Sequence, residues 1–154
     1  MKKFLFVTGL LLASILSFAQ TDEQKAVQQA IAGVFDGLSY RDIIYVKQNT
    51  TTGFTVLEQG VVWTMDTIVA KIDQLRAMTS YHRDNYFQFL QTSINGNTAF
   101  VSYFNNATII VKGKSQYKHW LESAYLVKEG DNWKVQLLHS SVVPSQVLNQ
   151  PDRK

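Results

Sequence analysis

The stretch Ser115–Val143, SQYKHWLESAYLVKEGDNWKVQLLHSSVV, decides the fold of this chain. Its two halves are rich in Val, Leu, Tyr and Trp, and they flank the segment Glu129-Gly130-Asp131-Asn132. Because Gly, Asp and Asn tolerate the backbone angles of a tight turn, the stretch predicts a β-hairpin. In a hairpin without irregularities, Glu122 faces His139 with their Cβ atoms about 4.5–5.5 Å apart. This pair is the leading candidate for a functional site.

Two further turns extend the sheet upstream. Asn95-Gly96 is a strong hairpin signal, and Lys112-Gly113 also places a glycine in a turn. The three turns together predict four long strands, at Tyr81–Ser93, Thr98–Val111, Ser115–Lys128 and Trp133–Val143. If every hairpin is tight and free of bulges, each residue of these strands can be assigned to a row across the sheet.

The rows on one face of this sheet grade from apolar to polar. The first two rows are almost wholly apolar: Thr92, Ala99, Leu126 and Val135, then Leu90, Val101, Ala124 and Leu137. The next two are polar and aromatic: Gln88, Tyr103, Glu122 and His139, then Tyr86, Asn105, Trp120 and Ser141. The opposite face mixes aromatic side chains with small polar ones, a composition that suits a protein partner.

Helical periodicity precedes the sheet. The expected elements are a helix over Asp22–Leu38 behind a capping box, a short helix after Asp42, a small hairpin over Phe54–Trp63 and a third helix begun by Thr64 or Asp66. Because their apolar stripes need the drier face of the sheet, we place the helices over the Leu90 row. The polar rows then line a cavity between helices and sheet.

The N-terminus carries the features of an export signal. Lys2 and Lys3 precede fifteen uncharged residues, 4–18, and Ser17-Phe18-Ala19 fits a small-x-small cleavage signature. We therefore expect a signal peptide at 1–19, one domain at 20–143, a flexible tail at 144–154, and a periplasmic or extracellular protein. The mature chain has 13 basic and 12 acidic residues, a balance of +1, so a nucleic-acid partner is not expected. No later segment is as apolar as residues 4–18, so no membrane partner is expected after signal cleavage. The absence of cysteine excludes disulfides and thiolate catalysis.

Three segments carry a resemblance to a known superfamily: Phe54–Gly60, Trp120–Ser123, and Gly130–Lys134 leading to Leu138-His139-Ser140. With the order of elements, they make the chain similar to the nuclear transport factor 2 superfamily, and within it to a secreted bacterial branch grouped with polyketide-cyclase-like domains. The resemblance implies an α+β fold, with a cone-shaped, curved antiparallel sheet of four long strands and a small hairpin wrapped around three N-terminal helices. It also implies a pocket in the cone and a homodimer through the outer sheet face. No catalytic set of the superfamily maps onto this sequence residue by residue.

Glu122, His139 and Tyr103 are the catalytic candidates. The carboxylate can fix the imidazole tautomer while the free ring nitrogen exchanges a proton with a ligand, and Tyr103 can donate to a developing oxyanion. The alternative is a buried network in which these groups only satisfy one another. The ligand-binding candidates are Tyr86, Gln88, Asn105, Trp120, Ser141 and Glu58. The histidines lack metal-ligand spacing, so no metal and no other cofactor is expected.

Two functions fit these observations. The first is an exported binding or accessory module whose cone encloses a small apolar or ring-containing molecule. The second is a small-molecule lyase or isomerase that transfers protons through His139 and Glu122. An enzyme should lose a catalytic titration in His139→Ala, whereas a binding module should lose only affinity or stability. A structural dimer with a collapsed cavity is the third possibility.

Overall fold

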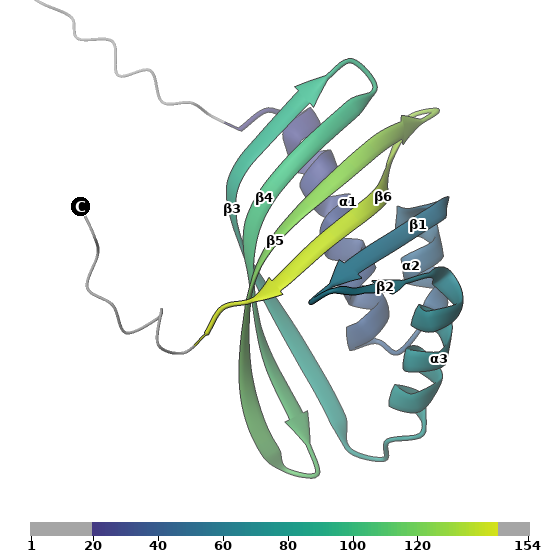
Figure 1. Ribbon diagram of the computed structural model, residues 1–154, viewed down its shortest axis with the longest axis vertical. Coiled ribbons are helices and arrows are strands. Elements are labelled where there is room, and N and C mark those ends of the chain that lie inside the picture. Colours follow the sequence, from purple (N-terminus) through teal and green to yellow (C-terminus); the bar gives the residue numbers. More distant parts are fainter. Residues whose placement is uncertain (1–19, 145–154) are drawn as a thin grey trace, which may run out of the picture.

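A computed structural model describes residues 20–144, within which the chain forms three helices and six strands (Figure 1). The expected signal peptide and the segment after Pro144 lie outside the described residues. In chain order the elements are α1 (Asp22–Ser39), α2 (Ile43–Asn49), β1 (Thr50–Glu58), β2 (Val61–Trp63), α3 (Met65–Arg76), β3 (Tyr81–Asn95), β4 (Thr98–Val111), β5 (Lys114–Glu129) and β6 (Asn132–Val142). None of the helices within residues 20–144 combines the length and the apolar character needed to cross a membrane.

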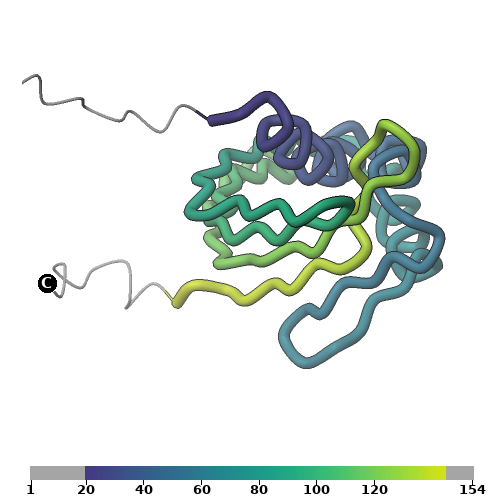
Figure 2. The backbone as a smooth tube through the Cα atoms, turned by 90° about the horizontal axis from the view of Figure 1, so that it is seen from above, coloured from purple at the N-terminus to yellow at the C-terminus, as the bar shows by residue number. Residues whose placement is uncertain are grey.

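The six strands form one sheet in the order β2-β1-β6-β5-β4-β3. The long strands curve past the helices, which pack on the concave side of the sheet (Figures 1 and 2). The predicted α+β fold, a curved sheet wrapped around three N-terminal helices, is confirmed. One pairing differs from the expected antiparallel sheet, because β1 runs parallel to β6. The chain between these strands passes through α3 and three long strands, and so long a connection allows either direction.

Helix α1 forms where the sequence predicts it. Its capping box is present: the Gln24 backbone N–H donates to Thr21 Oγ1 at 3.1 Å, and the Thr21 N–H donates to Gln24 Oε1 at 3.0 Å. These bonds satisfy donors that the first helical turn leaves free. The buried stripe of α1 then covers the concave face, with Val27 and Ile31 wholly buried.

Two glycines let α1 and α2 approach closely. A β-carbon at Gly37 would collide with the side chain of Val46 and lie 3.1 Å from the carbonyl oxygen of Asp42. One at Gly33 would collide with the amide of Asn49. Because these glycines have no side chain, α2 packs closely against α1. This packing fixes the position of β1, which follows α2 directly.

The central hairpin has the predicted register throughout. Strands β4 and β5 pair from Thr98 opposite Val127 to Val111 opposite Lys114 without a shift. Their inward residues include Val101 and Leu126, both fully buried. Tyr103 stands opposite Glu122 on this face, as expected.

Strand β3 departs from the predicted register. Its turn closes on Asn95 opposite Thr98, and the register shifts between Phe89 and Gln91, which leaves Leu90 as an extra, bulged residue. Counted from the turn, an extra residue moves every side chain beyond it to the other face, which in β3 means the residues before Leu90. The prediction that Leu90 faces the core was therefore wrong, because its side chain is 51% exposed.

The same bulge turns a row of aromatic rings inward. Phe87 and Phe89 lie against the buried ring of Tyr103, with centroid distances of 5.9 and 5.6 Å, and Phe87 also packs 5.4 Å from Phe35 of α1. The burial of these rings stabilises the bulged form of β3, since each aromatic side chain removes a large apolar area from water.

Strand β6 carries a second bulge. Its register against β5 shifts between Leu126 opposite Val135 and Tyr125 opposite Leu137, so that Gln136 is the extra residue. Glu122 consequently faces Ser140, while His139 faces Ser123 on the outer side. The predicted pairing of Glu122 with His139 was wrong for this reason.

Candidate functional site

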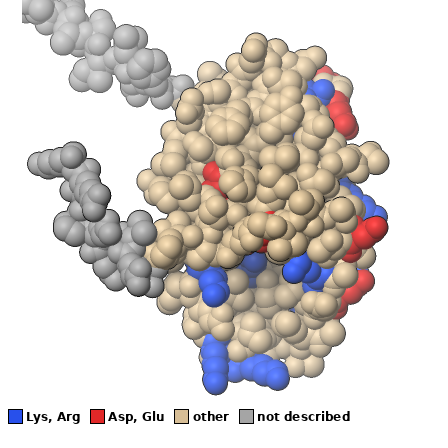
Figure 3. Space-filling model, in the orientation of Figure 1, with Lys and Arg blue, Asp and Glu red and all other residues tan. Residues whose placement is uncertain are grey.

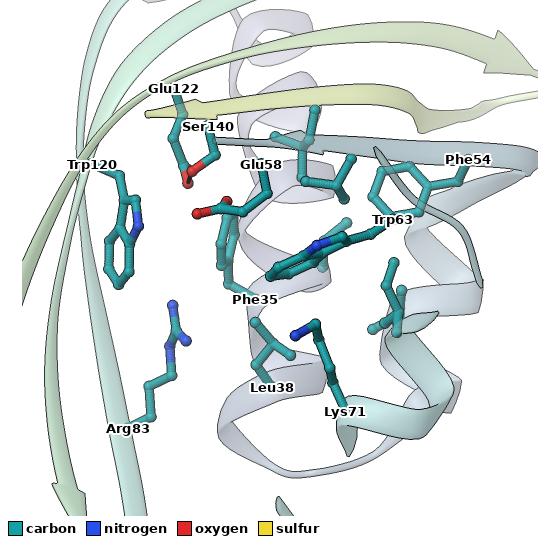
Figure 4. A pocket seen from close by; sticks show the side chains of 15 residues that line it. Phe35, Leu38, Phe54, Glu58, Trp63, Lys71, Arg83, Trp120, Glu122 and Ser140 are labelled. Atoms are coloured by element: carbon teal, nitrogen blue, oxygen red, sulfur yellow. Dashed lines mark hydrogen bonds between the residues drawn. The ribbon is translucent and has the colours of Figure 1, made fainter. Parts of the chain in front are cut away.

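A cavity of about 110 Å³ lies between the concave face of the sheet and the helices (Figure 4). Its walls come from α1, α2, α3, the β1–β2 hairpin and the inner faces of β3, β5 and β6. Most of the lining is apolar: Val34, Phe35, Leu38, Val46, Phe54, Val56, Ile68 and Leu138, with the rings of Trp63 and Trp120. Five polar side chains complete it: Glu58, Lys71, Arg83, Glu122 and Ser140.

Glu122 is the most constrained polar group of this cavity. Its side chain is only 5% exposed, and both carboxyl oxygens have partners. Ser140 Oγ donates to Oε1 at 3.0 Å, and Asn105 Nδ2 donates to Oε2 at 3.2 Å. Figure 4 shows the carboxyl pointing into the cavity beside that of Glu58. Asn105 and Ser140 therefore fix the direction of the carboxyl.

Burial raises the pKa of Glu122 from 4.5 to about 7. The hydrogen bonds from Ser140 and Asn105 and the nearby hydroxyl of Tyr103 act in the opposite direction because they favour the carboxylate, while the charge of Glu58 adds to the rise. The balance shows that desolvation outweighs hydrogen bonding at this position. A carboxyl with this pKa can both hold and release a proton near neutral pH.

Two polar atoms beside Glu122 are buried without hydrogen bonds to described residues. They are the hydroxyl of Tyr103 and Oδ1 of Asn105. The Tyr103 hydroxyl influences the neighbouring carboxyl but lies outside the geometry of a direct hydrogen bond. Burial, with the Glu122 charge as a smaller contribution, raises the pKa of Tyr103 well above its usual value, so the phenol stays neutral. Unpaired buried groups of this kind are rare and mark places where water or a ligand completes the network.

The opposite side of the cavity is cationic. Arg83 points inward from β3, with its guanidinium carbon 5.4 Å from the centroid of Trp120 and 5.9 Å from that of Phe35. Lys71 points inward from α3, with Nζ 4.0 Å from the centroid of Trp63. Burial lowers the pKa of Arg83, while Tyr81, Glu122 and Glu58 raise it. Two cations thus face two carboxyls across an apolar cavity (Figure 4).

The structure brings five of the predicted site residues together. Glu122, Trp120 and Glu58 line the cavity, and the buried Tyr103 and Asn105 stand behind Glu122. The functional roles of these residues stay predictions.

Four predicted site residues lie elsewhere. They are exposed on the outer face, which corrects their assignment to the polar rows: His139, Tyr86, Gln88 and Ser141. The cause is the same in each case, because a bulge separates each of the four from the hairpin turn on which the register was based and reverses the inward and outward positions beyond it.

Four side chains of the cavity were not predicted as site residues from the sequence: Arg83, Lys71, Trp63 and Ser140. A signal for Arg83 exists in the alternation of β3, where Phe87 and Phe89 occupy odd positions and Thr92 and Ile94 occupy even ones. This change of parity is typical of a bulge, and it places Arg83 on the same face as the two phenylalanines. For Lys71 no comparable signal exists, because its place at the cavity depends on how α3 docks.

Among residues 20–144, no three side chains of His, Cys, Asp or Glu come together in a way that could hold a metal ion. The polar groups of the cavity are instead carboxyls, cations, an amide and a hydroxyl. Such a set binds organic molecules through hydrogen bonds and charge.

No sequence-family model and no curated protein matches this chain. Solved structures do match. A ketosteroid isomerase-like protein from Erwinia carotovora atroseptica shares 15% identity, with 81% of this chain and 99% of that chain covered and a TM-score of 0.63. The calmodulin-dependent kinase II hub of S. rosetta also shares 15% identity, with 81% and 100% covered and a TM-score of 0.67.

A third match is a protein from Streptomyces avermitilis described as a dehydratase of the nuclear transport factor 2-like family. It shares 15% identity over 79% of this chain and 96% of that chain, with a TM-score of 0.67. Together these likenesses show that the chain has the nuclear transport factor 2-like fold. At such low identity they concern the fold alone, since this fold hosts unrelated functions.

Proposed function

We propose that this protein is a binding module for a small, largely apolar molecule held in the cone. The observation that carries the proposal is the cavity itself, which combines apolar walls with a few inward polar groups of fixed direction. Ligand sites in proteins have this composition, because apolar walls supply affinity and placed polar groups supply orientation.

The size of the cavity limits the ligand. An apolar cavity of roughly 150 Å³ engineered in another protein binds benzene. The cavity of about 110 Å³ therefore fits about one ring or a short branched chain, with any further atoms in its mouth. The rings of Trp63 and Trp120 at its sides suit a flat ligand.

A thermal-shift and calorimetric titration with benzyl alcohol and benzamide tests the proposal. Ligand bound to the folded state alone raises the melting temperature with concentration. Leu38→Phe, which fills the cavity from α1, should abolish binding, whereas Leu121→Phe on the outer face should leave it unchanged. Absence of binding by any single-ring compound at millimolar concentration would overturn the proposal.

A second candidate is proton-transfer catalysis, as in a lyase or isomerase. The specific observation in its favour is Glu122, a cavity carboxyl with a pKa of about 7. Two structural neighbours are described as ketosteroid isomerase-like and as a dehydratase. Because His139 lies on the outer face, Glu122 would act without it, held by Ser140 and Asn105.

Deuterium exchange separates this candidate from simple binding. A proton-transfer enzyme should incorporate deuterium at the carbon next to the carbonyl of a bound cyclic ketone, and Glu122→Gln should lose that exchange. His139→Ala, the matched control, should retain it. Binding without exchange would leave the protein a binding module.

We also propose a homodimer through the outer sheet face. Large apolar side chains are exposed there: Tyr86, Leu90, Phe100, Leu121 and Tyr125. Figure 3 shows that the part of this face in view is largely free of charged residues. Two of the structural neighbours are described as hubs and one as an association domain. Tyr125→Glu should dissociate the dimer without unfolding it, and a monomeric parent protein in light scattering would refute the dimer.

We further propose that the protein is exported. Lys2, Lys3 and the uncharged run 4–18 support this proposal. Expression in a bacterial host followed by fractionation and N-terminal sequencing should give a periplasmic or secreted chain that begins at Gln20. A cytosolic chain that retains residues 1–19 would contradict it.

A further inference from the structure

Resting on the proposed binding function, we infer that the ligand is a small apolar carboxylic acid whose carboxylate binds between Arg83 and Lys71. Arg83 lines the cavity from β3. Its Nε donates to Asn85 Oδ1 at 3.1 Å, and the side chain of Tyr81 lies close to its guanidinium. No carboxylate among residues 20–144 accepts a hydrogen bond from its two terminal nitrogens. Arg83 forms no ion pair within the same range.

A guanidinium in this position needs a partner. It is half-buried and lies beside the rings of Trp120 and Phe35. Those rings give a modest attraction to the cation but accept none of its terminal N–H groups. A partly buried cation without an anionic partner in contact is costly, because no ion pair offsets the loss of hydration. The structure therefore holds a charge that a ligand could satisfy.

Lys71 of α3 places a second cation at the cavity. Its ammonium sits over Trp63 and likewise makes no ion pair or hydrogen bond to the described residues. Figure 4 shows both cations entering the cavity from the side opposite Glu58 and Glu122. In Figure 3, Lys and Arg side chains gather around a hollow in the lower half of the molecule, so the approach for an anion is favourable.

The carboxyls of the cavity do not neutralise these cations by direct contact. Glu122 directs both oxygens to Ser140 and Asn105, and Glu58 accepts from Gln59 at 3.1 Å. An external anion is therefore the group that completes the cationic side. A carboxylate matches the planar fork of Arg83, in which two parallel N–H groups can donate to two oxygens.

The remaining walls describe the rest of the ligand. They are apolar and offer about 110 Å³, which suits the hydrocarbon part of a one-ring or short branched acid. Two cations beside two carboxyls suit a monoanion better than a doubly charged phosphate. The protonated form of Glu122 can additionally donate to a polar substituent at the far end of the ligand.

The test compares benzoate with benzamide, which has nearly the same shape and no charge. Both are titrated into the protein at pH 6.5 by calorimetry and by the fluorescence of the cavity tryptophans. Benzoate should bind at least tenfold more tightly than benzamide. In Arg83→Met and Lys71→Met, benzoate affinity should fall tenfold or more, and the preference for benzoate over benzamide should be lost.

Lys112→Met is the matched control, because it removes one exposed cation at the β4–β5 turn. It should leave both affinities unchanged. Equal binding of benzoate and benzamide by the parent protein would overturn the inference and leave the binding function standing. If neither compound binds, both proposals fail. Because the parent comparison needs no variant, the inference stays testable even if Arg83→Met does not fold.

Discussion

The central hairpin β4–β5 and the flanking strands β3 and β6 differ in one respect. The central pair runs through fourteen facing pairs without interruption, whereas each flanking strand carries one bulged residue. In the central pair, alternation places Glu122 and Asn105 inward, where they are found. On the flanking strands a single extra residue reverses inside and outside, and the chemistry of the site changes with it.

The two bulges decide which side chains face the cavity. Without the bulge at Leu90, Gln88 and Tyr86 would face inward in place of Phe87, Phe89 and Arg83. Without the bulge at Gln136, His139 would stand beside Glu122 in place of Ser140. The bulges thus convert an expected Glu–His pair into a carboxyl that faces cations across an apolar space.

Two alanine substitutions, Leu138→Ala and Leu137→Ala, compare the two faces of β6 directly. Leu138 is 3% exposed and packs in the core, so its truncation should cost roughly 3–4 kcal/mol. Leu137 is only partly buried on the outer side, and its truncation should cost about 1 kcal/mol. Thermal or urea unfolding of the two variants measures both losses. A larger loss for Leu137→Ala than for Leu138→Ala would mean that Leu137 faces the core, as in the register without a bulge.

Glu122 should make stability depend on pH. Because its pKa is raised from 4.5 to about 7 in the folded protein, the folded state binds more protons than the unfolded state between these values. Stability should therefore fall as pH rises from 4.5 to 7 and then level off, by about 3 kcal/mol in total. Glu122→Gln removes this contribution, so its stability relative to the parent should rise over that interval. Parallel pH profiles of the two proteins would mean that the carboxyl is solvated.

The smallest expected effects distinguish neighbours on β6. Ser140→Ala removes a donor to the buried carboxyl and should cost about 1–2 kcal/mol at pH 8. His139→Ala changes an exposed side chain and should stay within about 0.5 kcal/mol. Both are read from urea unfolding curves. A larger cost for His139→Ala would place the imidazole inside the cone.

Much of the architecture could be predicted because it depends on local chemistry. The capping box at Thr21 and Gln24, the apolar stripe of α1 and the glycine turns at 96, 113 and 130 all act within a few residues. The bulges depend instead on curvature, because a long sheet that wraps a helix must concentrate its bending somewhere. Only the change of parity around Leu90 and Gln136 records them in the sequence.

The amino-acid sequence by itself determined the order of elements, the fold class and the inward position of Glu122 on an uninterrupted strand. Tertiary structure alone decided which residues face that carboxyl. Docking of α3 brings Lys71 to the cavity, and the bulges of β3 and β6 bring Arg83 and Ser140 to it. The physical reason is that alternation along a strand is a local property, whereas the point at which alternation breaks is set by how the whole sheet bends around its core.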